Sequence, residues 1–263
     1  MEMRILFIGD IVGKPGRRAV RELLPDMITS YGVDFVIANC ENAAAGFGIT
    51  REIVDELYQG SIDVLTSGNH VWDKKEIRDF VEDYETLLRP ANYPEGTPGW
   101  GHVLVKMKSG ISLGVLNLAG RVFMQPIDCP FRKAERELAA FSGKTKIIIV
   151  DMHAEATSEK KALGWFLDGR VSAVLGTHTH VQTADDEILP GGTAYISDAG
   201  MTGPFDSVIG VKKEVVIDKF LFQIPNRFDI AKGDIRLQGV MLDVDEKDGK
   251  CSRIQRLSVR LNS

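Results

Sequence analysis

The chain has 263 residues, a net charge of −5 at pH 7 and a pI near 5.6, so a large basic face for duplex nucleic acid is not indicated. Hydrophobic residues make up 44% of the sequence, yet no run approaches the roughly 18 apolar residues that a membrane helix needs. The N-terminus carries no signal-peptide pattern, and the three cysteines, Cys40, Cys129 and Cys251, are odd in number and widely spaced. We therefore expect a cytoplasmic protein with no disulfide framework and no membrane partner.

Apolar runs and helical patterns alternate along the first third of the chain. Three runs are suited to buried parallel strands, and they are "RILFIGD", "VDFVIANCEN" and "DVLTSGNH". Helical spacing follows the first run at residues 20–28, where Pro25 should kink or interrupt the helix. A short helix is expected at about 50–58. A longer one is expected at 77–87, which Pro90 closes.

The remaining two thirds of the chain add both hairpin strands and buried apolar strands. "HVLVKM" and "ISLGVLNL" form a predicted hairpin around Ser109 and Gly110. "TKIIIVDMH" and "VSAVLGTHTH" are two more apolar strands, separated by a helix that carries Leu163 and Leu167. Residues 236–261 look like two strands about a turn at Asp248. This order predicts one continuous α/β domain over residues 1–263, with antiparallel strands toward its end.

Polar side chains stand where five of these apolar strands end. In open α/β sheets the carboxyl ends of the strands form the ligand-binding edge, so these side chains are expected to meet. Four of the five histidines of the chain fall in the set, together with two acids and two amides. Such donors suit iron, manganese and zinc, and their number exceeds one tetrahedral site, which favours two neighbouring metals. The set is Asp10, Glu41, Asn42, Asn69, His70, His153, His178 and His180.

Each of these residues alone also has a structural interpretation. Asp10 could cap a helix, Asn69 could form a turn, and His153 could be a half-buried, hydrogen-bonded residue. Their joint placement favours a metal centre. In an extended "THTH" the imidazoles of His178 and His180 would point to opposite sides, so binding two metals requires a turn there. His102 lies outside these motifs and keeps the structural interpretation.

The stretch "LFIGDIVGKPG" at residues 6–16 looks like a phosphate-binding loop. A P-loop needs Gly, four residues, then Gly-Lys followed by Ser or Thr. Here Gly9 and Gly13 enclose only three residues, and Lys14 is followed by Pro15, which removes an amide donor. We therefore interpret Asp10 as a metal ligand, beside glycines that let the chain turn tightly.

These motifs resemble the calcineurin-like metallophosphoesterases, which carry an acid after each of two strands, then Gly-Asn-His, His and Gly-His-x-His. More closely, the chain resembles the YmdB-type 2′,3′-cyclic-nucleotide phosphodiesterases over nearly its whole length. It departs from the broad superfamily in having Val12 for the usual histidine, Glu41 for the commoner Asp and an inserted Thr177. The stretches that carry the closer resemblance are "GDIVGKPGR", "NCENAAAGFGIT", "SGNHVWDKKEI", "NLAGRVFM" and "DAGMTGPFDSVIGV".

The resemblance implies a four-layer α/β/β/α sandwich with mixed sheets and a site for two metal ions, most readily iron, with manganese or magnesium as alternatives. Glu41 would bridge the two ions. The first ion would also be held by Asp10, Asn42 and His180. The second would also be held by Asn69, His153 and His178. Association into a homo-oligomer is also implied.

The residues permit hydrolysis of a phosphodiester by a metal-bridging hydroxide, with His70 as the general acid or, alternatively, as a residue that orients another ligand. The resemblance implies 2′,3′-cyclic nucleotides as substrates, opened at the 2′ ester to leave a 3′-phosphate. Either a small cyclic nucleotide or an RNA end would fit. Arg121 and Thr202 are candidate substrate contacts, although each could simply shape a loop.

Three other classes of protein compete with this interpretation. A metal-dependent amidohydrolase also uses a His-x-His pair, but on the first strand of an eight-fold βα barrel, and no eight repeats are apparent here. A non-catalytic nucleotide-binding signalling protein would present the same pocket. A purely structural metal protein is disfavoured, because structural sites tend to be rich in cysteine and the three cysteines lie outside the set.

Overall fold

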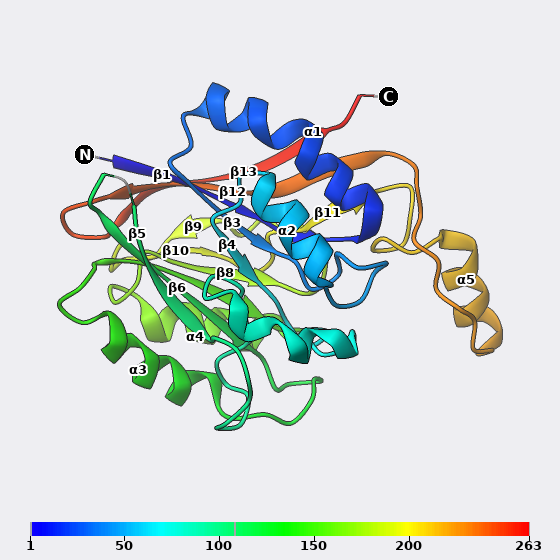
Figure 1. Cartoon of the computed structure of the whole chain (residues 1–263), viewed down its shortest axis with the longest axis horizontal. Helices are drawn as coiled ribbons and strands as arrows, with labels where there is room; N and C mark the ends of the chain where they lie inside the picture. Colours follow the sequence, from blue (N-terminus) through cyan, green and yellow to red (C-terminus); the bar gives the residue numbers. More distant parts are fainter. Residues whose placement is uncertain (1, 108, 263) are drawn as a thin grey trace.

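The computed structural model describes residues 2–107 and 109–262, and its two mixed sheets lie face to face (Figure 1). The first sheet has seven strands in the order β2-β11-β12-β1-β3-β4, with β13 beside β12. Strands β1, β3 and β4 run parallel, whereas β12 is antiparallel to both β1 and β13. The bounds are β1 (Glu2–Ile8), β2 (Asp10–Ile11), β3 (Phe35–Asn39), β4 (Val64–Thr66), β11 (Met201–Pro204), β12 (Ile235–Asp245) and β13 (Cys251–Arg260).

The second sheet has six strands in the order β5-β6-β7-β8-β10-β9. Strands β6, β7, β8 and β10 run parallel, and the edge strands β5 and β9 are antiparallel to their neighbours. The predicted hairpins at 102–118 and 236–261 are therefore confirmed. The bounds are β5 (His102–Lys106), β6 (Ser112–Ala119), β7 (Ile147–His153), β8 (Ala173–Thr177), β9 (Glu187–Ile188) and β10 (Ala194–Ile196).

Alternation along β1 shows how the layers are built. Ile5 and Phe7 pack between the two sheets, while Leu6 and Ile8 point to the opposite face and pack against helices. The first sheet is covered by α1 (Gly13–Tyr31) and α2 (Arg51–Gln59), and the second by α3 (Pro130–Phe141) and α4 (Thr157–Leu167) (Figure 1). The expected α/β/β/α sandwich is confirmed, and the eight-fold barrel of the amidohydrolase alternative is not the fold.

Two local predictions need correction. Residues 77–87 do not form one helix but two short 3-10 helices, η1 (Lys75–Asp79) and η2 (Val81–Asp83). The reason is tertiary. The Leu88 amide donates to the Leu65 carbonyl, and the Leu65 amide donates to the Thr86 carbonyl, so the end of this segment lies beside β4. Pro25 does not interrupt α1 either, since buried side chains on both sides of it hold the helix against the sheet.

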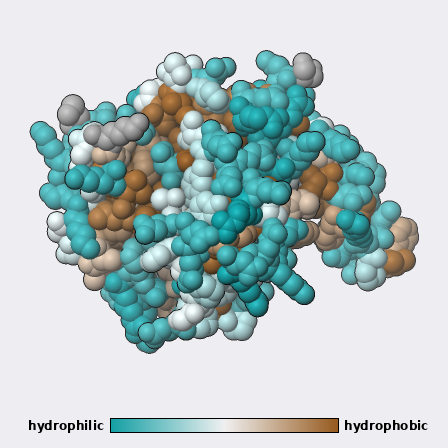
Figure 2. Space-filling view, in the orientation of Figure 1, coloured by the Kyte–Doolittle hydropathy of each residue, from teal (hydrophilic) through white to brown (hydrophobic). Residues whose placement is uncertain are grey.

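The sequence patterns did not predict α5 (Lys213–Phe222), which projects from the body of the molecule (Figure 1). Its end is strongly apolar and exposed, with Phe220, Leu221 and Phe222 all at least 65% accessible, and brown atoms mark it in Figure 2. None of the helices in the described chain is long and apolar enough to cross a membrane. The three cysteines are free thiols.

Candidate metal centre

The carboxyl ends of strands from both sheets converge on one place. Strands β1, β3 and β4 end close to one another because they are parallel neighbours, and β7 and β8 do the same in the second sheet. Face-to-face packing of the two sheets then brings the two sets of ends together. Side chains that are up to 170 positions apart in the chain, Asp10 and His180, come within 3.9 Å of each other.

One group of donors surrounds the ring nitrogen Nε2 of His153. This atom lies 3.1 Å from Glu41 Oε1, 3.1 Å from Asn69 Oδ1 and 3.0 Å from His178 Nδ1. Single ligand atoms of Glu41, His153 and His178 all lie within 4.8 Å of one another. One carboxylate oxygen, one amide oxygen and two imidazole nitrogens thus lie close together. Such a donor set suits a borderline divalent cation.

A second group lies beside it around Asp10. Asp10 Oδ1 is 3.9 Å from His180 Nε2 and 3.8 Å from His153 Nδ1, both too far for a hydrogen bond. Asp10 Oδ1 and Asn42 Oδ1 are buried and have no hydrogen-bond partner among the described residues. Asn42 is held by its other end, where Nδ2 donates to the Gly46 carbonyl at 2.9 Å. Buried acceptors without partners are rare and costly, and a cation would satisfy both oxygens.

Gly68 leaves the space in which the first group meets. A Cβ atom at this position would lie 2.2 Å from Cδ2 of His153 and 2.3 Å from Oε2 of Glu41. No side chain fits there without moving both residues. The glycine of the Gly-Asn-His motif is thus explained by the closeness of these two donors.

The segment after β8 makes the turn that the two-metal hypothesis requires. His178 and His180 have φ values of 99° and 64°, in the left-handed region that is unfavourable for residues with a Cβ atom. Thr179 between them donates from its amide and its hydroxyl to Asp198 Oδ2, at 2.9 and 2.7 Å. Asp198 is in turn paired with the buried Lys160 at 2.9 Å. This ion pair, which the sequence patterns did not single out, holds the strained turn in place.

A buried relay orients His153. Asp151 accepts the hydroxyl of Thr177 at 2.7 Å, so this hydroxyl is left to accept from His153 Nδ1 at 2.9 Å. His153 therefore carries a proton on Nδ1, and its Nε2 is directed to the centre. Asn39 and Thr66 donate to the other oxygen of Asp151, at 3.0 and 2.5 Å. Asp151 was missed by sequence reasoning because it lies two positions before the histidine, inside the strand.

Burial and close charged neighbours shift the pKa values of three residues at this centre. Burial would raise the pKa of Glu41, but the charge and hydrogen bond of His153 outweigh burial and hold that pKa at about 2. Burial would lower the pKa of His153, but Glu41, Asp10 and Asp151 raise it to about 9. Burial and the neighbouring His153 lower the pKa of His178 to about 3. A metal ion at Nε2 of His153 would compete with a proton for that nitrogen, so metal binding is expected to depend on pH.

The centre opens into a pocket of about 350 Å³. His70 lies at this pocket, with Nδ1 2.9 Å from Asp73 Oδ2 and its ring edge-on to Phe47 at 4.9 Å between centroids. The backbone amide of His70 donates to Glu41 Oε2 at 3.1 Å. The wall facing the polar groups is apolar and consists of Val12, Phe47, Ile209, Val211, Phe228 and Ile230.

Comparison with known proteins agrees with this geometry. The sequence model of the YmdB-like protein family matches residues 6–257. The chain belongs to the YmdB-like family. It is 53% identical to the 2′,3′-cyclic-nucleotide 2′-phosphodiesterase of Bacillus subtilis, covering 98% of this chain and 97% of the relative. A putative phosphatase/phosphodiesterase of Mycoplasma genitalium is 34% identical, with 99% and 94% covered.

Two solved structures share the fold of this YmdB-like chain. A hypothetical protein from Thermus thermophilus superposes with a TM-score of 0.91 at 45% identity, covering 98% of this chain and 99% of the other. A structure described as a novel phosphatase from Mycoplasma pneumoniae gives a TM-score of 0.92 at 32% identity, with 99% and 94% covered. Both likenesses extend over the full set of strands that carry the candidate centre.

The opening stretch of the YmdB-like chain is not a phosphate loop. The backbone amides of Gly9, Asp10 and Gly13 donate to the backbone carbonyls of Gln238, Gly200 and Asn42, respectively. These three amide protons are therefore not available to bind a phosphate. A Cβ on Gly9 would lie 2.0 Å from the Gly200 carbonyl oxygen. The glycines of this stretch permit close backbone packing that carries Asp10 into the centre.

Arg121 and Thr202 take other places. Thr202 is fully buried in β11, where its hydroxyl donates to the Gln238 carbonyl at 3.1 Å. The Arg121 amide donates to the carboxylate of Glu159, at 3.0 Å from Oε2, and its side chain is exposed. Neither is among the described residues that line the pocket. His102 pairs with Glu137 and packs edge-on to Phe141, in agreement with its structural interpretation.

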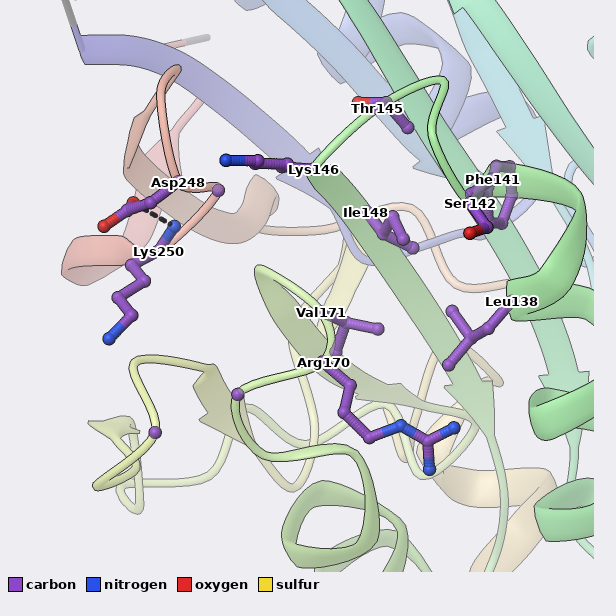
Figure 3. A pocket seen from close by; sticks show the side chains of 13 residues that line it. Leu138, Phe141, Ser142, Thr145, Lys146, Ile148, Arg170, Val171, Asp248 and Lys250 are labelled. Carbon is purple, nitrogen blue, oxygen red and sulfur yellow. Dashed lines mark hydrogen bonds between the residues drawn. The ribbon is translucent and has the colours of Figure 1, made fainter.

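A second hollow, of about 320 Å³, lies at the end of the second sheet opposite the metal pocket, where β7 and β8 begin (Figure 3). Its lining includes Lys146, Arg170, Lys250 and Asp248, together with Leu138 and other apolar side chains. The carboxylate of Asp248 accepts the amide of Lys250 at 2.9 Å within its own turn. No histidine is among its described lining residues.

Proposed function

We propose that this YmdB-like protein is a metal-dependent phosphodiesterase that hydrolyses 2′,3′-cyclic nucleotides at the 2′ ester and leaves a 3′-phosphate. The relative from Bacillus subtilis, 53% identical over nearly the whole chain, is named for this activity. One observation of the structure carries the metal dependence. Two buried oxygens, on Asp10 and Asn42, have no partner in the described chain beside a second cluster of four converging donors.

The donor chemistry fits two divalent cations. Asp10, Glu41, Asn42 and His180 would hold the first ion, and Glu41, Asn69, His153 and His178 the second. The donors suit iron and manganese nearly equally, and the resemblance favours iron, with manganese or magnesium as alternatives. Such ions supply Lewis acidity and lower the pKa of coordinated water toward about 7. With the chelating groups contributed by rigid strand ends, the protein sets the positions of both ions before substrate binds.

The charge of the pocket also supports metal dependence. Its described lining contains the carboxylates of Glu41 and Glu155 but no lysine or arginine. A phosphodiester carries a negative charge and would be repelled by carboxylates alone. The pocket therefore needs bound cations before it can attract such a substrate, and a metal-free protein is expected to be inactive.

His70 is positioned to deliver a proton to the leaving oxygen. An ionised Asp73 can only accept a hydrogen bond, so it fixes the proton on His70 Nδ1 and leaves Nε2 to exchange the other proton with substrate. When the bond between phosphorus and the 2′ oxygen breaks, that oxygen needs a proton, and a positioned imidazole is the usual donor. His70 also lies outside both proposed ligand sets.

The apolar wall fits the nucleobase. Phe47 and Phe228 are aromatic, and Ile209 and Ile230 are branched aliphatic residues. None of these side chains offers a hydrogen bond to the edge of a base, so stacking and burial would hold it with little discrimination among the four bases. The phosphate would then face the metal ligands and the base would lie against this wall.

The test begins with elemental analysis of protein purified without added metal. The same sample is assayed on 2′,3′-cyclic, 3′,5′-cyclic and linear diesters and on phosphate monoesters, before and after chelation. We expect about two ions per chain, and 2′,3′-cyclic hydrolysis that chelator abolishes and metal restores. The variant His102→Ala serves as a control, because it removes a histidine that lies outside the centre. Nucleotide binding without any single-turnover product would instead indicate a sensor, and preference for monoesters would refute the substrate class.

A further inference from the structure

A groove of about 500 Å³ adjoins the candidate metal pocket and shares Phe228 and Ile230 with it. One side of this basic groove comes from the start of α1, and the other from residues 227–235. Its charged lining residues are four basic ones and one acid, Lys14, Arg18, Arg227, Lys232 and Asp229. In a chain with a net charge of −5, this is a local concentration of positive charge.

Most of that positive charge is not neutralised. Lys14, Arg227 and Lys232 form no ion pair within the described chain, whereas Asp229 is paired with Lys212 at 3.2 Å. Arg18 is the basic lining residue that pairs, with Glu22 at 2.8 Å. Three cations therefore face the groove without a counter-charge from the protein, which is the condition for binding an anionic ligand.

The beginning of α1 adds to this effect. The first turn of the helix contains no acidic residue and carries Lys14 instead, although the positive end of the helix dipole disfavours a cation there. The groove also continues into a further hollow of about 540 Å³, which shares Arg18, Lys232 and Ile235 with it and adds Arg260 and Asp234, an ion pair at 2.9 Å.

We propose that the basic groove binds the phosphodiester backbone of a single-stranded RNA whose 3′ end, a 2′,3′-cyclic phosphate, lies in the metal pocket. This inference rests on the proposed function and names its substrate class. A 2′,3′-cyclic phosphate exists only on ribose, and it forms when the 2′-hydroxyl of RNA displaces the next nucleotide. The groove is a local basic feature of a protein with a net charge of −5 and lacks the large basic face that duplex binding requires, which favours a single strand.

The reaction at such an end balances as for a free nucleotide. Water adds to phosphorus, the bond from phosphorus to the 2′ oxygen breaks, and the 2′ oxygen takes up a proton. The product is an RNA strand that ends in a 3′-phosphate. Preceding nucleotides would continue from the metal pocket past Phe228 and Ile230, which both hollows share, and place their phosphates near Lys14, Arg227 and Lys232.

The decisive measurement compares two substrates at increasing KCl. One is a 2′,3′-cyclic mononucleotide, and the other is a six-nucleotide RNA that ends in the same group. Three phosphate contacts predict a slope of about −2 for log kcat/KM against log salt with the RNA, at roughly −0.7 per contact. The mononucleotide, which does not reach the groove, is expected to show a slope near zero.

The variant Lys14→Ala/Arg227→Ala/Lys232→Ala is expected to lower kcat/KM for the RNA at least tenfold and for the mononucleotide less than twofold. A matched control removes two lysines and one arginine at the far end of the molecule, as Lys146→Ala/Arg170→Ala/Lys250→Ala (Figure 3). This control variant should leave kcat/KM unchanged for both substrates. Circular dichroism of both variants confirms that they fold.

Other outcomes separate the two proposals. Rapid hydrolysis of the mononucleotide with no advantage for the RNA, or equal effects of the two triple variants, would overturn the groove and leave the phosphodiesterase proposal intact. Hydrolysis of neither substrate would overturn both. If single-stranded DNA of equal length competes as well as product RNA, the groove binds polyanions generally, and the assignment to RNA ends is wrong.

Discussion

The second sheet has a hollow at each end, and the two hollows differ in chemistry rather than in size. The pocket at the carboxyl ends of β7 and β8 measures about 350 Å³ and the one at their amino ends about 320 Å³. The first is lined by Glu41, His178 and His180. Behind these residues, Asp10 is fully buried and has one oxygen without a partner among the described residues. The second is lined by the cationic side chains of Lys146, Arg170 and Lys250, and its Asp248 accepts a hydrogen bond from the amide of Lys250.

This contrast separates the two hollows by their buried polar atoms rather than by their volume. Leaving a buried acceptor unsatisfied costs about 1–3 kcal/mol, and a ligand that contacts the oxygens of Asp10 and Asn42 would remove that cost. Among the described residues that line the amino-end hollow, none has a buried polar side-chain atom without a partner. Substitutions should therefore affect activity at one end of the sheet and not at the other.

The largest effect is expected from Glu41→Ala. Glu41 is the carboxylate that would contact both ions, and removing it should lower metal content below two per chain and kcat/KM by about 10³-fold or more. Metal content is measured by elemental analysis and activity on a 2′,3′-cyclic nucleotide. Arg170→Ala, at the opposite end, should stay within twofold of the parent. Equal losses in both variants would remove the distinction between the two ends.

His70→Ala should retain both metals but lower kcat by about 10²- to 10⁴-fold, which is the usual contribution of a general acid. The loss should be smaller for a substrate with a good leaving group, such as a nitrophenyl diester, because that oxygen needs no proton. A variant that loses metal would show His70 to be a ligand. A loss of only about tenfold that is equal for both substrates would favour an orienting role.

Phe47→Ala tests the apolar wall. Stacking of a base on an aromatic ring contributes about 1–3 kcal/mol, so KM for a cyclic nucleotide should rise roughly fivefold or more with kcat little changed. The conservative Phe47→Tyr should restore most of the affinity. A ribose 2′,3′-cyclic phosphate without a base should be hydrolysed equally by all three proteins, and a parallel rise in its KM would contradict the assignment.

The smallest effect concerns stability far from the centre. The hydrogen bond from His102, helped by Lys133, holds the pKa of Glu137 at about 2 in spite of partial burial. Because the folded-state pKa is lowered, this pairing stabilises the fold above about pH 4.5 and is lost as the pH falls toward 2. We expect a contribution on the order of 1 kcal/mol after solvent screening.

Glu137→Gln should accordingly flatten the loss of unfolding free energy between about pH 4.5 and 2, measured by urea denaturation. Activity per metal-loaded chain should not change, since Glu137 is remote from the pocket. An unaltered pH dependence of stability in this variant would show that the pairing with His102 contributes nothing to the fold.

Several features could be predicted from local sequence alone. Continuous apolar runs are sufficient to identify buried strands, and β1, β3, β7 and β8 lie where those runs predicted them. Because parallel strands end at a common edge, the residues that follow them were expected to gather, and the distances around His153 agree. The turn at His178 and His180 also followed from the need to direct two imidazoles to one centre.

Other features were decided only by the tertiary structure. Residues 77–87 have a helical pattern, yet they form two short 3-10 helices, and backbone hydrogen bonds with Leu65 hold the end of the segment beside β4. The residues that support the centre, such as Asp151, Lys160 and Asp198, are polar groups whose partners are distant in sequence, so no local pattern marks them. The basic groove joins Lys14 to Arg227, more than 200 residues apart. Local periodicity is read within a few residues, whereas charge and hydrogen bonding depend on which distant residues the packed sheets bring together.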